Sequence, residues 1–490
     1  MRKLVRLLLR LSLFAFIVVV GIFTINTIRF ASKQVKIDPI KQGAVDDATV
    51  QRFAQGIQFP TVSSESKVDT NAFEQLLQFI ETAYPLADSL LEKEVVNQFS
   101  LIYKWQGRNP KLDPILLMGH TDVVPVEESS ISKWEHAPFS GDIADGFIWG
   151  RGTLDDKLNV FGLLEAVSSL LEKNFTPERT VYLAFGHDEE VSGLHGAQAM
   201  AKIFKSRKIN FEFILDEGSF TIGEALNGLE APLAMIGIAE KGYTTLTVTA
   251  SLQEGGHSSM PPAETAVGVL SKAIYTLQSN PFPAKIDGAV KDMLDYIGPE
   301  MSPLFKVIFA NTWLTEGILK AQFSSSPQSA ALIRTTTAPT MLRGGIKDNV
   351  LPTRASAKVN FRILPGETPE SVLEYVRTII DDPRVVVNFS EGKFNNAPSA
   401  LSSTESFGFQ IIQKTIQQIN PEVVVAPSLV IGATDSRHYA ELSENIYRYS
   451  PVQIHKSETK RIHGINERLS VDEFKQMTRF YHQLIVNATR

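Results

Sequence analysis

The stretch of sequence that decides the fold is Ile115-Leu116-Leu117-Met118-Gly119-His120-Thr121-Asp122. Its first four residues form a continuous apolar run, which is typical of a strand buried on both faces in a parallel sheet. Residues 181–185 form a second such run, and residues 211–215 form a third that is apolar apart from Glu212. Polar residues closely follow each run, and ligand sites in open α/β sheets lie outside the carboxyl ends of the strands. The sequence therefore predicts an α/β fold with a mostly parallel sheet flanked by helices and a site at one sheet edge.

The polar residues at this predicted edge are ligand types that zinc binds. Zn²⁺ accepts imidazole nitrogen and carboxylate oxygen, and a hydrolytic site leaves a position for water. Three candidates follow the runs, one stands at a predicted helix start, and one lies far downstream. In chain order they are His120, Asp155, Glu190, Asp216 and His463. We interpret them as the ligands of two zinc ions.

Charge balance favours two ions over one. We assign His120 and Asp216 to one ion and Glu190 and His463 to the other, with Asp155 bridging both. Three carboxylates and a bridging hydroxide then balance two Zn²⁺ ions, so the centre is neutral and its burial is tolerable. Two adjacent ions would polarise a scissile carbonyl and stabilise both oxygens of a tetrahedral intermediate. The pattern therefore predicts a hydrolase.

Two more carboxylates have predicted roles beside the ligands. Glu189 stands next to Glu190 and is free to act as the catalytic base. Asp122 lies two residues beyond His120 on an extended segment, so it points the same way and can orient the imidazole ring. Acidic pairs such as Glu189-Glu190 are usually solvated; their placement after a buried strand favours the catalytic interpretation here.

Together these motifs resemble those of the aminoacylase, carboxypeptidase S and dipeptidase family of co-catalytic zinc peptidases. The likeness is strongest to its membrane-anchored carboxypeptidase S and N-fatty-acyl-amino-acid synthase/hydrolase branch. It extends from about Val50 to the C-terminus. The further matching motifs are Gly256-His257-Ser258-Ser259, Thr335-Thr336-Thr337-Ala338-Pro339-Thr340, Asn349-Val350-Leu351-Pro352, Asn360-Phe361-Arg362 and Gly432-Ala433-Thr434-Asp435-Ser436-Arg437-His438-Tyr439.

The resemblance implies roles for residues outside the metal set. The five ligands carry over as assigned, and Glu189 carries over as the general base. His257 would come from a lid domain to stabilise the oxyanion, while Arg362, with Asn349 nearby, would hold the terminal carboxylate of the substrate. For Arg437, next to Asp435, a structural ion pair and a substrate role remain equal alternatives.

Composition excludes several other classes of protein. With 490 residues and 43% hydrophobic content, the chain can bury a large core in more than one domain. Its net charge of −6 offers no basic surface for nucleic acid. The chain contains no cysteine, which excludes a thiol nucleophile, a cysteine zinc site and any disulfide. The G-x-S-x-G, H-E-x-x-H and P-loop motifs are also absent from the sequence.

The N-terminus predicts a single transmembrane helix. Residues 11–28 form a largely apolar run that, at 1.5 Å per residue, nearly spans a ~30 Å hydrocarbon layer. Arg2, Lys3, Arg6 and Arg10 precede it, so we expect the N-terminus in the cytosol and the catalytic domain on the other side, in a periplasm, a lumen or the exterior. A cleaved signal peptide is the alternative interpretation.

The remaining chain divides by its hydrophobic pattern. Strand and helix patterns alternate up to about residue 240, whereas residues 244–250 and 354–363 show the period-two alternation of half-buried strands. Two strand–helix–strand blocks predict a small inserted α+β domain. The resemblance implies that this domain is a ferredoxin-like lid, through which a homodimer could form. The expected division is an anchor (1–31), a linker (32–45), a catalytic domain in two segments (46–240 and 394–490) and the inserted lid (241–393).

The partly apolar segment 280–333 has two interpretations. It contains Phe305, Ile308, Phe309, Trp313 and Leu314. A helix packed on the lid is the first interpretation, and an apolar substrate groove or membrane contact is the second.

The predicted function is zinc-dependent hydrolysis of the amide bond next to a free C-terminal carboxylate. The substrate would be a short peptide or an N-acyl amino acid. A reversible N-fatty-acyl amino acid synthase/hydrolase, which shares every catalytic residue, is an alternative. A catalytically inactive membrane-anchored binding protein is a third, and it would have lost a ligand or Glu189, neither of which is lost.

Overall fold

The computed structural model describes residues 2–41, 43–64, 67–392 and 395–490. Its largest element is a mixed sheet with strand order β20-β10-β11-β19-β9-β5-β8-β4-β3, in which β18 also pairs with β11. The strands are β3 (Glu92–Val96), β4 (Ser100–Trp105), β5 (Ile115–His120), β8 (Val181–Gly186), β9 (Phe213–Asp216), β10 (Thr221–Gly223), β11 (Leu233–Glu240), β18 (Val424–Val430), β19 (Ile446–Arg448) and β20 (Gln453–His455).

The three apolar runs of the sequence lie side by side at the centre of this sheet. β5 runs parallel to β8 on one side and to β9 on the other, with Ile115 opposite both Val181 and Phe213. Antiparallel pairs such as β3–β4 and β4–β8 extend the sheet outward. The predicted α/β class and the parallel central strands are therefore confirmed, within a sheet that is mixed overall.

Helices cover both faces of the large sheet, which explains why β5 is apolar at every position. Ile115 and Leu117 pack with residues of α2 (Asp47–Ile57), α5 (Lys157–Glu172) and α14 (Val471–Ala488). Leu116 and Met118 face the opposite way and pack with α6 (Ala197–Ser206). Side chains of a strand alternate between faces, so burial of both faces needs an unbroken apolar run.

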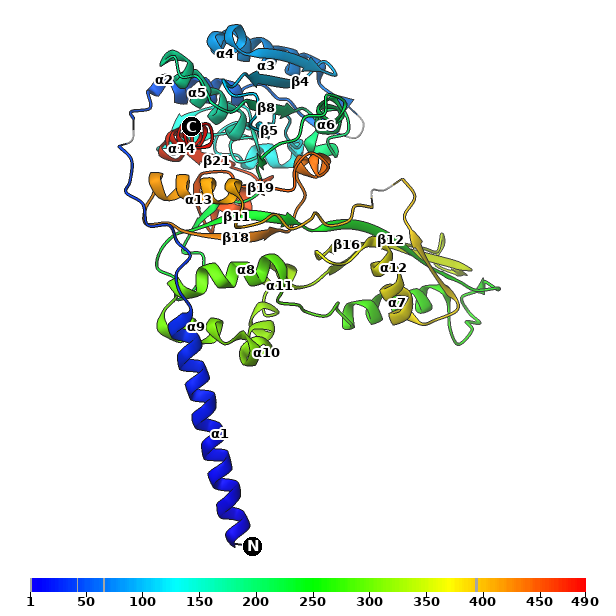
Figure 1. Cartoon of the computed structure of the whole chain (residues 1–490). Helices are drawn as coiled ribbons and strands as arrows, with labels where there is room; N and C mark the ends of the chain where they lie inside the picture. Colours follow the sequence, from blue (N-terminus) through cyan, green and yellow to red (C-terminus); the bar gives the residue numbers. More distant parts are fainter. Residues whose placement is uncertain (1, 42, 65–66, 393–394) are drawn as a thin grey trace.

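A second, antiparallel sheet has the order β14-β16-β12-β17. Its strands are β12 (Gly242–Ser251), β14 (Thr336–Gly344), β16 (Arg354–Ile363) and β17 (Val385–Phe389), and its helices are α7 (Ala266–Ser279) and α12 (Pro369–Ile380). The alternating residues Leu246, Val248, Val359 and Phe361 join a core of their own with both helices. The small antiparallel lid sheet predicted from the alternation is present (Figure 1).

The helices between the two parts of the lid pack on the core of the large sheet. It forms α8 (Gly288–Ile297), α9 (Pro303–Ala310), α10 (Thr312–Phe323) and α11 (Pro327–Ile333). Val290, Leu294 and Leu319 belong to the same hydrophobic core as the large sheet, and α8 lies against β18. The helix prediction for 280–333 is correct; the helices pack on the core of the large sheet, whereas Phe282, which precedes them, packs in the lid core. The expected lid end at 393–394 lies outside the described residues.

The remaining short elements connect or extend these layers. The helices are α3 (Thr70–Ala83), α4 (Pro85–Leu90) and α13 (Phe407–Ile419). The strands are β1 (Ser63–Ser64), β2 (Lys67–Val68), β6 (Ile143–Ala144), β7 (Phe147–Trp149), β13 (Gly256–His257), β15 (Val350–Leu351) and β21 (Arg468–Ser470). The short 3-10 helices are η1 (Glu128–Lys133), η2 (Glu189–Val191), η3 (Gly298–Glu300), η4 (Asp435–Tyr439) and η5 (Glu458–Arg461).

The N-terminal helix α1 (Arg2–Arg29) projects away from the rest of the chain beside α9 (Figure 1). Its stretch Lys3–Arg29 has a mean hydropathy of 2.5 and is long and apolar enough to cross a membrane. A signal sequence has the same length and composition, so this measure alone fits both interpretations.

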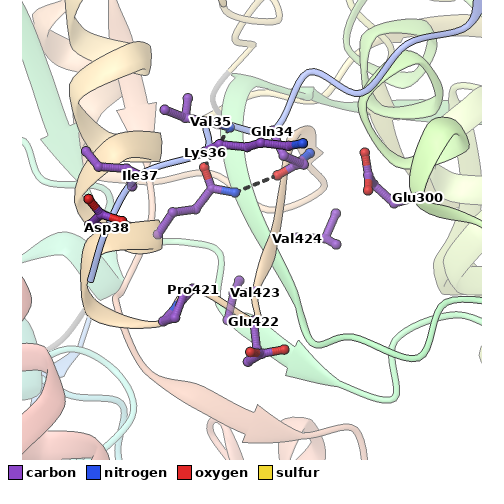
Figure 2. Close-up of a pocket in the computed structure, with 11 residues that line it drawn as sticks. Gln34, Val35, Lys36, Ile37, Asp38, Glu300, Pro421, Glu422, Val423 and Val424 are labelled. Carbon is purple, nitrogen blue, oxygen red and sulfur yellow. Dashed lines mark hydrogen bonds between the residues drawn. The ribbon is translucent and has the colours of Figure 1, made fainter. Parts of the chain in front are cut away.

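The predicted linker is an extended segment that docks on the large sheet. The Gln34 amide donates to the Val425 carbonyl at 2.9 Å and accepts from the Val425 N–H at 2.9 Å, so it pairs with the free edge of β18. Gln417 of α13 donates to the side-chain amide oxygen of Gln34 at 3.0 Å. Figure 2 shows this contact at the wall of a pocket of about 530 Å³, which contains none of the predicted site residues.

Candidate metal centre

His120 is the last residue of β5 and is almost fully buried. Its Nδ1 lies 3.0 Å from the Asp122 carbonyl oxygen and 3.3 Å from the Asp122 carboxylate. Asp122 also accepts the backbone N–H groups of Glu189 and Glu190, each at 3.2 Å. It thereby connects the ends of β5 and β8, and leaves His120 Nε2 facing the sheet edge.

Asp155 has the geometry of a bridging carboxylate. Its Oδ1 lies 3.0 Å from Nε2 of His120, and its Oδ2 lies 2.9 Å from Nε2 of His463. It stands just before α5, so the two oxygens reach histidines that are more than 300 residues apart in the sequence. Glu190 completes this side, with its Oε1 3.2 Å from His463 Nε2.

Possible metal-holding groups overlap at His120. One group combines His120, Asp155 and Glu190, and a second combines His120, Glu189 and Glu217; within each, the potential ligand atoms lie within 4.8 Å of one another. The two groups share one histidine, and together they place four carboxylates around it. This donor set fits divalent cations that accept nitrogen and oxygen ligands.

The structure places Glu217, and not Asp216, in this cluster. Glu217 Oε1 lies 3.7 Å from His120 Nε2. Asp216, the last residue of β9, accepts the Ser436 N–H at 2.8 Å and so faces the start of η4. Successive side chains at a strand end point to opposite sides, and only one of the two can face the imidazole. Asp216 therefore lies outside the two groups of candidate ligands, and its predicted role as a ligand stays a prediction.

The cluster is short of positive charge. Burial raises the pKa of the Glu189 carboxyl well above its usual range, and the nearby Asp435 carboxylate adds to the shift. Burial likewise raises the pKa of Glu217, helped by the carboxylates of Asp155 and Asp156. Buried carboxylates crowded in this way favour their neutral forms unless a cation lies among them. The electrostatics thus agree with a site that holds metal ions.

Two arginines lie at the junction of the centre and the lid. Arg437 Nη1 is 3.9 Å from Glu189 Oε1 and donates to the Thr434 carbonyl at 3.0 Å. Arg362, near the end of β16, lies over the Tyr243 ring at 5.0 Å from its centroid. Burial lowers the pKa of Arg362, and the positive charge of Arg437 contributes to the shift. The charge of Arg437 therefore acts on Arg362.

His257 and Asn349 lie at the opposite end of the lid sheet. His257 pairs with Val350 in a two-stranded ribbon, is exposed, and has its Nδ1 2.8 Å from Ser259 Oγ. This ribbon joins the sheet where Ser251 pairs with Arg354, eight residues from Tyr243, or roughly 26 Å along the strand. Within one chain the structure does not bring His257 or Asn349 to Arg362 or to the metal cluster.

Sequence reasoning missed Glu467, which ties two ligand loops together. Its Oε1 accepts the backbone N–H groups of Gly152 and Leu154 at 2.9 and 2.8 Å. Its Oε2 pairs with Arg151, whose Nη2 donates to the His463 carbonyl at 3.1 Å. Glu467 is fully buried, and it fixes the loops that lead to Asp155 and to His463 relative to each other. Nothing in its local sequence distinguishes it from a surface glutamate.

The sequence of this chain is similar to known hydrolases over nearly its whole length. The family model described as peptidase family M20/M25/M40 matches residues 116–487. The chain is 40% identical over 481 residues to a probable carboxypeptidase S-like 2 of Dictyostelium discoideum, covering 95% of this chain and 91% of that protein. It is 39% identical over 437 residues to the N-fatty-acyl-amino acid synthase/hydrolase PM20D1 of Homo sapiens, covering 88% and 86%.

Solved structures share the fold. The crystal structure of the M20 family metallo-carboxypeptidase Sso-CP2 from Sulfolobus solfataricus superposes with a TM-score of 0.64 at 18% identity, covering 90% of this chain and 99% of that chain. The YXEP protein of Bacillus subtilis, described as a dinuclear metal binding peptidase from the M20 family, gives a TM-score of 0.55 at 12% identity, covering 91% and 99%. At these identities the likeness concerns the fold.

Proposed function

The chain belongs to peptidase family M20/M25/M40 and is a carboxypeptidase-like metallohydrolase, and on this premise we propose that it cleaves the amide bond preceding a free C-terminal carboxylate. The placement of Asp155 carries the proposal, because its two oxygens face two different histidines. A carboxylate in this position can hold two metal ions side by side, which is the arrangement of co-catalytic hydrolases.

We assign the metal-binding role to His120, Asp155, Glu190 and His463, with Glu217 in the place predicted for Asp216. Zinc is the proposed metal, since imidazole and carboxylate groups are its usual ligands. Two zinc ions bound there would polarise the substrate carbonyl and make a bound water more acidic. Asp122 keeps the His120 ring oriented, and Asp216 instead supports the loop that carries Arg437.

Glu189 is the proposed general base. It lies in η2 at the end of β8, close to His120 and Glu217 but on the side where Arg437 approaches. A carboxylate there takes a proton from the attacking water and returns it to the leaving amine. Burial raises the pKa of Glu189 and so strengthens it as a proton acceptor.

Arg362 is proposed to bind the terminal carboxylate from the lid side, with Arg437 opposite. Among the residues that the structure describes, no carboxylate pairs with Arg362, so its guanidinium group is available to a ligand. Arginine binds carboxylates through two parallel hydrogen bonds, which selects substrates that end in a free acid. The neighbouring charge of Arg437 strengthens the attraction for an anion.

A substrate panel tests this proposal. Full-length enzyme supplied with zinc is assayed on dipeptides and on long-chain N-acyl amino acids, each as the free acid and as the C-terminal amide. We expect one or both classes of acid to be hydrolysed, and their amides to react at least about a hundredfold more slowly because the carboxylate–arginine pair is lost. Equal rates for acids and amides would contradict the proposed recognition.

The reverse reaction is the second candidate function. Relatives named N-fatty-acyl-amino acid synthase/hydrolases, such as the human protein described above, favour it. Condensation of a fatty acid with an amino acid would use the same residues in the opposite direction. Formation of N-acyl amino acid from both free acids in the same panel distinguishes a reversible enzyme from a peptidase.

In this conformation, His257 can stabilise the oxyanion at a metal centre only if that centre belongs to a second copy of the chain. The separation along β12 and β16 keeps His257 away from the metal cluster of its own chain. We propose a homodimer through the lid that places His257 of each copy at the site of the other. Glu189→Gln and His257→Ala chains should each be nearly inactive as homodimers.

Mixed dimers check this arrangement. When the two inactive chains are denatured and refolded together in equal amounts, one site in each mixed dimer has both residues intact. We expect about a quarter of wild-type activity, since half of the dimers are mixed and each contains one working site. Activity no higher than that of the separate variants would contradict sharing of His257 between chains.

The proposed location follows from α1. With its basic residues in the cytosol, α1 would anchor the enzyme with the catalytic domain on the non-cytosolic side. The docked segment after α1 supports an anchor, since residues 33–40 belong to the folded structure.

A further inference from the structure

The last two turns of α1 pack against α9 and α10. The rings of Phe23 and Trp313 meet edge to face, with centroids 6.1 Å apart. The side chain of Asn26 donates to the Asn311 side-chain oxygen at 3.0 Å. Just beyond α1, the Phe30 ring lies so close to Gly298 that a Cβ there would be 2.4 Å from it. The residues of α9, α10 and Gly298 that make these contacts therefore form a packing site for the end of α1, which we call the socket.

The socket lies at membrane depth if α1 spans a bilayer. The apolar run of α1 ends at Ile28, and Phe23 lies five residues earlier, about 7.5 Å further along the axis. Asn26 falls within the same run, where an unpaired amide would be costly, and its partner Asn311 is completely buried. The contact thus satisfies a polar group of α1 and brings the start of α10 to the level of the hydrocarbon boundary.

Next to the end of α1, the helices α9 and α10 expose large apolar side chains. Leu304 is 70% exposed, Trp313 55%, Leu314 56% and Ile318 63%. Leu314 and Ile318 are one helical turn apart, with Gly317 between them, so they form a continuous face. The charged residues Glu316 and Lys320 pair with each other at 2.7 Å. Figure 1 shows α10 beside the upper part of α1, on the side of the molecule from which α1 projects.

The segment that connects α1 to the catalytic domain is held in place by several contacts. Lys33 lies over the Tyr296 ring at 4.7 Å, and its carbonyl accepts from Gln413 of α13 at 3.0 Å. Gln34 then pairs with β18. The end of α1, the helices α9 and α10, and the sheet edge are therefore held as one unit.

We propose that Leu304, Trp313, Leu314 and Ile318 form a lipid-binding platform that enters the outer bilayer interface beside α1. The platform is continuous with α1, and exposed apolar side chains with a tryptophan suit the region between headgroups and acyl chains. Two contacts at different points of the surface hold the enzyme at a fixed orientation, whereas a tether alone would not. The inference rests on the proposed membrane placement of α1 and is independent of the reaction.

The lack of cysteine allows a direct test on the full-length chain. Single variants Leu314→Cys and Ile318→Cys carry a nitroxide label in phosphatidylcholine vesicles, and collision rates with oxygen and with a water-soluble nickel complex are compared. Ile17→Cys, within α1, reports whether the helix is inserted, and Tyr275→Cys, 72% exposed on the lid helix α7, reports the aqueous reference. Circular dichroism confirms that each variant is folded.

We expect labels at 314, 318 and 17 to favour oxygen and the label at 275 to favour the nickel complex. Nickel accessibility at 314 and 318 equal to that at 275, with 17 in lipid, would overturn the platform while leaving the anchor intact. Dipolar broadening at 314 would instead assign this face to a second copy and also overturn the proposal. A mature chain shown by mass spectrometry to lack α1, and recovered only in the soluble fraction, would refute both the anchor and the platform.

Discussion

Glu189→Gln should abolish turnover while two metal ions per chain stay bound. The substitution keeps the size of the side chain but removes the proton acceptor, and loss of a general base costs about 10²- to 10⁴-fold in rate. Glu189 lies within 4.8 Å of His120 and Glu217, yet the bridging geometry of Asp155 does not involve it. Steady-state kinetics and elemental analysis of the same preparation measure the two quantities.

The matched control is Glu217→Gln, an equally conservative change in the same cluster. Because Glu217 faces His120, we expect this variant to lose metal as well as activity, and excess zinc should restore part of the activity. Asp216→Asn should instead keep its metal, since its carboxylate accepts from Ser436. Loss of metal from Glu189→Gln would move Glu189 into the ligand set, and loss from Asp216→Asn would reinstate the ligand predicted from the sequence.

Arg362→Ala should impair hydrolysis of free acids by several orders of magnitude, and amidation of the substrate should then cause little further harm. Removing one partner from a buried, charge-assisted pair typically costs about 3 to 5 kcal/mol. Arginine loss and amidation remove the same interaction from opposite sides, so the two losses should overlap instead of adding. The measurement is kcat/KM for wild type and variant on matched acid and amide substrates.

Arg362→Lys is the control that separates the effect of the shape of the side chain from the effect of its charge. It keeps the positive charge but not the planar fork that binds both carboxylate oxygens, so we expect an intermediate loss. Strictly additive losses for Arg362→Ala and amidation would show that Arg362 does not bind the carboxylate. Arg437, the neighbouring guanidinium, would then be the residue to test.

The sequence alone determined the central strands of the large sheet and much of the metal cluster. The runs that became β9, β5 and β8 are apolar at successive positions because helices bury both faces, and such runs are readable without tertiary information. His120 and Glu190 follow two of these runs, so the sheet itself brings them to one edge. The alternation of β12 and β16 likewise predicted a second, half-buried sheet, because a face covered by helices needs apolar residues only at every second position.

Only the tertiary structure shows that Glu217 lies beside His120 while Asp216 accepts from Ser436, because adjacent residues differ in the side to which they point. That arrangement depends on Ser436, whose backbone N–H lies 220 residues away in sequence and takes up the Asp216 carboxylate. The length and pairing of β12 and β16 set the separation of His257 from Arg362. The position of α8 is set by its packing against β18, a strand that lies far from it in sequence. Local patterns record whether a side chain is buried, whereas the partner that buries it is chosen by contacts between distant parts of the chain.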